Sequence, residues 1–188
     1  MNRLTRWTLL LAMATAAPCV WAMFPTVRIV APQLLGLACP DPDVCLDDTS
    51  RTQEARALYA DALRFVDQSV GHIARPPRVV FCASTSCYHD FGLTRPAGRT
   101  SALGIVISPR GWRTYYVRHE MIHHLQIERL GVIGQHSRPE WFTEGMAYAL
   151  SQDPREQLMQ QSQQDRARFE SWYRGLGSRD LWVAARAL

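Results

Sequence analysis

The chain has 188 residues, of which 47% are hydrophobic and 20% are charged. That length suits one domain with a substantial core, and the composition does not fit disorder, collagen or a coiled coil. Its formal net charge of +4 comes from 21 basic residues, all arginine, against 17 acidic residues. Two arginines lie within residues 1–6, and the others are scattered and nearly balanced by acids. The charge pattern therefore argues against a nucleic-acid partner, since binding to phosphates requires a clustered basic surface.

The N-terminal segment has the pattern of a targeting signal. Residues 1–6 carry positive charge, and residues 7–26 contain no charged residue and include an apolar stretch. We expect residues 1–26 to be either a signal peptide, cleaved after Ala22, or an N-terminal membrane anchor, because twenty uncharged residues just reach the length that crosses a bilayer. Residues 27–188 are expected to form a single domain in the periplasm or extracellular space, or anchored to the membrane by residues 7–26.

The cysteine count agrees with export. Beyond Cys19, the chain has Cys39, Cys45, Cys82 and Cys87, an even number that fits disulfides in an oxidising compartment. The disulfides Cys39–Cys45 and Cys82–Cys87 are favoured, because short loops cost the least entropy to close. Four buried free thiols are the alternative. The spacings do not match a structural zinc site built on Cys-x-x-Cys pairs.

The first half of the chain predicts an extended lead-in, one helix and two strands. Residues 23–50, rich in proline and aspartate, form the lead-in. Residues 50–70 have apolar residues at helical spacing and stop at a glycine, which predicts a helix. The β-branched runs at residues 78–82 and 104–108 predict strands, joined by a loop that carries Cys87.

The second half predicts helices. Residues 112–130 contain no proline or glycine and end at Gly131, which indicates a helix of about five turns. A loop follows, and two further helices are expected at about 140–151 and about 155–175. The fold class is therefore α+β.

The long predicted helix contains the sequence H-E-x-x-H, from His119 through Glu120 to His123. Residues four apart lie on the same face of a helix, so both imidazoles can reach one metal ion. Glu120 lies beside them, close enough to contact a water on that ion. The alternative is a core helix in which the two histidines are hydrogen-bonded structural residues.

A tightly bound zinc ion needs a third ligand. His124 points about 120° away from the bisector of His119 and His123 and is a poor candidate. The metzincin pattern H-E-x-x-H-x-x-G-x-x-H is excluded, because Gln126 and Arg129 occupy its last glycine and histidine. Glu144 lies 21 residues after His123, on a helix that a glycine-bearing loop can turn back. It can complete a site of two histidines and one glutamate, with a fourth position open.

The sequences HEMIHHLQIERLG and PEWFTEGMAYAL resemble the gluzincin branch of zinc metallopeptidases, in particular small peptidase-MA-like domains. The resemblance covers roughly residues 79–151. It implies a zincin-like fold with a small sheet, one zinc ion bound by His119, His123 and Glu144, and Glu120 as general base. It also implies that residues 104–108 form an edge strand beside the cleft, able to pair with an extended peptide.

One position departs from the thermolysin-like pattern: Tyr148 stands four residues after the glutamate ligand, where an acid is common. Tyr148 is the first candidate for a second oxyanion donor, ahead of His136, Tyr115 and Tyr116. These features favour an exported zinc peptidase that acts on peptides or proteins, in which Glu120 takes a proton from the attacking water. The alternatives are a non-catalytic zincin-like module that binds zinc or an envelope partner, and another metal-dependent hydrolase such as an amidase. The sequence does not indicate the oligomeric state.

Overall fold

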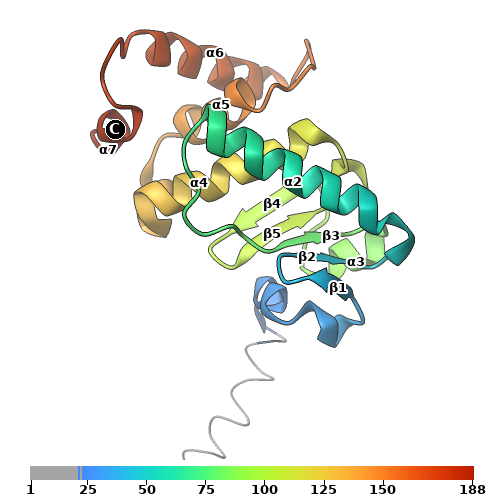
Figure 1. Ribbon diagram of the computed structural model, residues 1–188. Coiled ribbons are helices and arrows are strands. Elements are labelled where there is room, and N and C mark those ends of the chain that lie inside the picture. The colour runs from blue at the N-terminus through green and yellow to red at the C-terminus, as the bar shows by residue number, and fades with distance from the viewer. Residues whose placement is uncertain (1–20, 22) are drawn as a thin grey trace, which may run out of the picture.

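The computed structural model describes residue 21 and residues 23–188, which form a small mixed sheet covered by helices (Figure 1). The strands are β1 (Ala38–Asp41), β2 (Val44–Leu46), β3 (Val79–Phe81), β4 (Gly98–Ser101) and β5 (Gly104–Ile107). The α-helices are α2 (Thr52–Ser69), α3 (Thr85–Asp90), α4 (Thr114–Ser137), α5 (Glu140–Leu150), α6 (Gln160–Arg174) and α7 (Leu181–Arg186). Short 3₁₀ helices occupy Pro25–Val30, Pro32–Leu35, Thr49–Arg51 and Pro109–Gly111. The predicted α+β class is confirmed.

The sheet has the strand order β1-β2-β3-β5-β4. The three inner strands are parallel to one another, whereas β1 and β4 pair antiparallel with their neighbours. Parallel strands need a crossover connection, and α2 supplies it between β2 and β3. The edge strand β4 reaches β5 through two residues, Ala102 and Leu103.

Alternate residues of the inner strands face two different cores. In β5, Ile105 and Ile107 join the larger core beneath α2 and α4, whereas Val106 joins the smaller core with Tyr88 and Phe91. Strands that are buried on both faces read as continuous apolar runs. This explains why β3 and β5 could be predicted from the sequence.

Helix α4 is fixed to its neighbours by polar contacts as well as by packing. Arg118 donates two hydrogen bonds to Asp61 of α2, from Nε at 2.8 Å and from Nη2 at 3.0 Å. The indole nitrogen of Trp112, just before α4, donates to the carbonyl of Cys82 at 2.8 Å. The helix is interrupted at Gly131, whose φ of 76° is left-handed, as the expected stop at that glycine required. Residues 132–137 continue as a short helical stretch after this break.

Several sequence expectations were wrong. Residues 104–108 do not form an edge strand: β5 lies inside the sheet, and the edge beside the cleft is β4. The polar sequence of β4, GRTS, lacks the apolar run that reveals a strand.

The lead-in is not simply extended, because it contains two 3₁₀ helices and the β1–β2 pair. The loop around Cys87 contains α3, which Ser84 caps by accepting a hydrogen bond from the Cys87 amide. Helix α7 was not predicted.

The structure contains the disulfides Cys39–Cys45 and Cys82–Cys87, which confirms both predicted pairs. Disulfides indicate an oxidising, extracytoplasmic environment. Within residues 21 and 23–188, no helix is both long enough and apolar enough to cross a membrane. The predicted signal peptide or anchor lies almost wholly outside the described residues, as does Cys19.

Candidate metal centre and catalytic cleft

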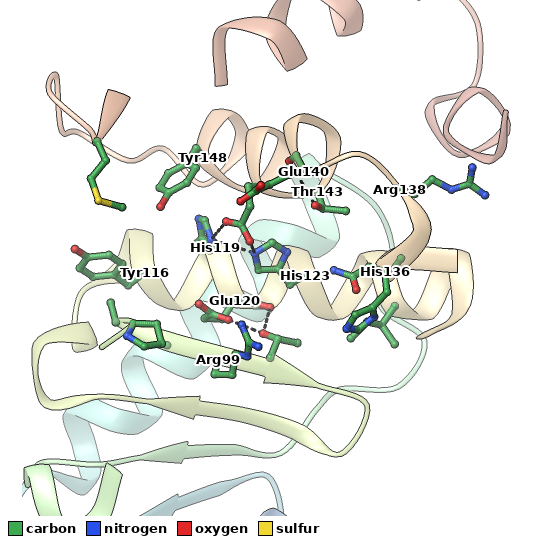
Figure 2. Close-up of a pocket in the computed structure, with 18 of the residues that line it drawn as sticks. Arg99, Tyr116, His119, Glu120, His123, His136, Arg138, Glu140, Thr143 and Tyr148 are labelled. Carbon is green, nitrogen blue, oxygen red and sulfur yellow. Dashed lines mark hydrogen bonds and ion pairs between the residues drawn. The ribbon is translucent and has the colours of Figure 1, made fainter. Parts of the chain in front are cut away.

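Three side chains predicted as metal ligands converge between α4 and α5 (Figure 2). The Nε2 atoms of His119 and His123 are 3.1 Å apart. The Glu144 carboxylate lies opposite them, with Oε2 at 3.4 Å from the His119 Nε2 and Oε1 at 3.4 Å from the His123 Nε2. The side chains of His119 and His123 are 11% and 10% exposed, whereas that of Glu144 is half-buried at 37%. The group could therefore hold a metal ion at the floor of an accessible cleft.

The donor types and the spacing of the two imidazole nitrogens are compatible with a zinc site. Zinc binds histidine nitrogen and carboxylate oxygen at about 2.0–2.2 Å, and two ligands at that distance and a tetrahedral angle are about 3.4 Å apart. The two imidazole nitrogens are 3.1 Å apart, close to that value, and each lies 3.4 Å from a different oxygen of the Glu144 carboxylate. With one donor atom taken from each of the three residues, all three atoms lie within 4.8 Å of one another. The donor set of two imidazoles and one carboxylate matches the chemistry of a catalytic zinc site.

The electrostatics of the three groups favour a cation among them. Burial acts to lower the pKa of His123, but the Glu144 carboxylate, together with the charge of Glu120 and the hydrogen bond to Gln126, outweighs burial and raises that pKa to about 9. Burial acts to raise the pKa of Glu144, but hydrogen bonds with both histidines keep it well below its usual range. Positive charge between these groups is thus stabilised, and a metal ion that binds there displaces protons from the imidazoles.

Gln126 fixes the orientation of His123. Its amide is fully buried, and its Nε2 donates to the Thr143 carbonyl at 2.9 Å. Because a carbonyl can only accept, the amide oxygen of Gln126 must face the His123 Nδ1, 2.9 Å away. The His123 Nδ1 therefore carries the proton in this bond and leaves Nε2 free as a ligand. The same amide connects α4 to α5, the helix that carries Glu144.

Glycine at position 145 allows α6 to pack directly behind the glutamate ligand. A Cβ built on Gly145 would lie 2.3 Å from the backbone carbonyl oxygen of Asp165 in α6. Phe142 is fully buried and packs against Phe169 and Trp172 of α6, and Trp141 also contacts Trp172. These aromatic contacts hold α5, the helix that carries Glu144, against α6.

Glu120 lies beside the three ligand candidates and faces a cleft of roughly 510 Å³. It is 8% exposed, and its Oε2 accepts a hydrogen bond from the Thr100 hydroxyl at 2.7 Å. Strand β4 and helix α5 supply the opposite walls of this cleft. The arrangement provides a carboxylate that can accept a proton next to a metal-binding group.

Of the four candidate oxyanion donors, three line the cleft and one does not. Tyr148 lines the cleft and packs its ring against His119, with 4.6 Å between the ring centroids. Burial raises the pKa of the Tyr148 phenol, so the phenol keeps its proton for donation. Tyr116 and His136 also line the cleft, and the Tyr116 hydroxyl accepts a hydrogen bond from Arg155 at 3.0 Å. Tyr115 is not among the lining residues.

His124 faces away from the metal centre, as its position on the helix predicted. Its Nε2 lies 2.8 Å from the backbone carbonyl of Arg75, and burial lowers its pKa. Sequence reasoning missed three residues that surround the centre: Gln126, Thr100 and Gly98. For Thr100 and Gly98 the one available signal was the two-residue spacing between β4 and β5, which is typical of a β-hairpin.

Comparisons of this chain with protein-family models, with curated proteins and with solved structures find no match. The case for a function therefore rests on the residues and geometry of the chain itself.

Proposed function

We propose that this chain is a zinc-dependent peptidase of the gluzincin type, with a zincin-like fold, that acts on peptides or proteins outside the cytoplasm. The observation that carries the proposal is the convergence of His119, His123 and Glu144 at separations of 3.1 to 3.4 Å beside the cleft-facing carboxylate of Glu120. The resemblance of the H-E-x-x-H and W-x-x-E-G segments to gluzincins supports it, and the disulfides support an extracytoplasmic location.

The chemistry divides between the metal centre and the chain. Zinc, when bound by the three ligands, acts as a Lewis acid that acidifies water and polarises a carbonyl group. Glu120 accepts a proton from the attacking water and then donates it to the amine that leaves. Its Oε1 accepts no hydrogen bond from the described residues and is the oxygen left for that proton, because Oε2 accepts the Thr100 hydroxyl.

Tyr148 is proposed to donate a hydrogen bond to the oxyanion that develops on the substrate carbonyl. Its ring contact with His119 places it against a ligand of the proposed metal, and it belongs to the helix that carries Glu144. A donor of this kind stabilises the charge of the transition state more than the uncharged carbonyl of the substrate. Tyr148 therefore completes a set of general base, metal ligands and oxyanion donor within one cleft.

The test is digestion of an unbiased peptide library by the zinc-loaded full chain and by its Glu120→Gln variant. The variant is expected to bind zinc like the wild type and to cleave nothing measurable, because an amide cannot accept the proton. Glu140→Gln is the matched control, since Glu140 lines the same cleft but does not belong to the proposed ligand set. A zinc-loaded wild type that cleaves no peptide would favour the non-catalytic zinc-binding module, and cleavage that survives Glu120→Gln would refute the assigned base.

A further inference from the structure

The edge strand β4 presents two residues to the proposed base. Gly98 and Thr100 pair with Ile107 and Ile105 of β5, both of which face the core beneath α4. Because side chains alternate between the faces of a strand, Gly98 and Thr100 face α4 as well. Both contact the same residue of that helix, Glu120.

Thr100 is bonded to two oxygens of Glu120. Its Oγ1 lies 2.7 Å from the carboxylate Oε2 and 2.9 Å from the Glu120 backbone carbonyl oxygen. A carbonyl oxygen and an ionised carboxylate oxygen are both acceptors and cannot donate. The two oxygens of Glu120 therefore share the single hydroxyl proton of Thr100. A hydrogen bond to an ionised carboxylate is roughly twice as strong as one between neutral groups. The contact therefore restrains the side chain relative to its own backbone.

Gly98 restrains the same side chain by close approach. A Cβ at position 98 would lie 2.6 Å from the Glu120 Cγ, 2.9 Å from its Cδ and 2.9 Å from its Oε1. Gly98 does not have a positive φ, so its backbone conformation is one that any residue adopts. Glycine is needed here for space, because the Glu120 side chain occupies the volume of a Cβ.

We infer that Gly98 and Thr100 form a cradle that sets the position of the Glu120 carboxylate, and that both are positioning residues for the proposed proton transfer. The inference rests on the proposed function. A glutamate side chain has three rotatable bonds, whereas a general base must be held within about 0.5 Å of its productive position. Gly98 packs against the Cγ, Cδ and Oε1 atoms of Glu120, and Thr100 donates a hydrogen bond to Oε2.

The first test replaces the hydroxyl and keeps the shape. Thr100→Val in the zinc-loaded full chain is expected to lower kcat roughly 10- to 100-fold, because misplacing a reacting group by about 1 Å can cost about 100-fold in rate. KM and zinc affinity should stay at the wild-type values, because Thr100 contacts neither the ligand set nor its hydrogen-bond partners. Thr100→Ser retains the hydroxyl and should restore most of kcat. Thr94→Val, on an exposed threonine of the preceding loop, is the control.

A purely structural role for Thr100 predicts a different pattern, in which the serine variant is as impaired as the valine variant and thermal stability falls with activity. That pattern would overturn the inference, as would a Thr100→Val protein with wild-type kcat.

The second test uses the space at position 98. Gly98→Ala is expected to displace the Glu120 carboxylate in a crystal structure of the zinc-loaded chain and to leave the ligand atoms of His119 and His123 in place. Gly134→Ala is the control, since its Cβ would meet only the Leu130 Cβ at 3.4 Å. An unmoved carboxylate would refute the cradle. This readout does not depend on turnover, so it decides the inference even if the wild type cleaves no peptide and the proposed function fails.

Discussion

The buried amide of Gln126 gives a prediction whose size can be worked out from its two hydrogen bonds. Replacing Gln126 with methionine keeps the volume of the side chain and removes both bonds, which leaves the His123 Nδ1 without a partner. The Thr143 carbonyl keeps its bond within helix α5 and loses its second donor. A buried polar group without a partner costs about 1–3 kcal/mol. Loss of the bond to the Thr143 carbonyl should lower the free energy of unfolding of the metal-free protein by about 0.5–1.5 kcal/mol, the net contribution of one hydrogen bond.

The loss at His123 should appear in zinc binding. Without the amide oxygen, His123 either keeps an unpaired Nδ1 proton or moves that proton to Nε2, where it blocks coordination. A loss of 10- to 100-fold in zinc affinity is typical for such a partner and corresponds to about 1.4–2.8 kcal/mol, which agrees with the cost of one unpaired group. The assays are competition with a chromophoric chelator for zinc and urea denaturation for stability.

Gln126→Glu separates the two bonds. Its carboxylate can still accept the His123 Nδ1 proton but cannot donate to the Thr143 carbonyl. We expect this variant to lose stability and to keep the zinc affinity of the wild type. Wild-type zinc affinity in the Gln126→Met protein would refute the claim that this amide orients His123.

Four further variants test the site and the packing behind it. Glu144→Ala should weaken zinc binding by orders of magnitude, and His124→Ala should not, as chelator competition will show; equal losses would mean that the ligand face of α4 is misassigned. Tyr148→Phe should lower kcat roughly 100-fold at unchanged zinc affinity in steady-state kinetics, and a fully active variant would remove Tyr148 from the mechanism. Gly145→Ala should lower the free energy of unfolding by about 1–3 kcal/mol in urea titration, because its Cβ would meet the Asp165 carbonyl at 2.3 Å; an unchanged midpoint would contradict this packing.

The parts of the site that depend on helical periodicity could be predicted from the sequence. His119, Glu120 and His123 lie within one turn or so of a single helix, so their relative positions follow from the helix itself. Glu144 required only that the chain reverse between Gly131 and α5, which glycine and proline indicated. The two disulfides were predictable because each closes a loop of six residues or fewer.

The surroundings of the site could not be predicted, because they depend on contacts between distant elements. Thr100 precedes Glu120 by twenty positions, and its role depends on β4 pairing with β5 and packing on α4. Gln126 contacts Thr143 only once α5 has packed on α4. The mistaken assignment of β5 as the edge strand has a related cause. The apolar run of β5 indicated a strand, but its place in the sheet depends on which strands pair with it.

The most direct test of the account is the metal content of the purified full chain after zinc reconstitution, combined with zinc X-ray absorption spectroscopy. We predict one zinc ion per chain, bound by two imidazole nitrogens and a carboxylate oxygen at about 2.0–2.2 Å, with the carboxylate contribution lost in Glu144→Ala. Failure to take up zinc stoichiometrically, or a spectrum without two imidazoles, would contradict it.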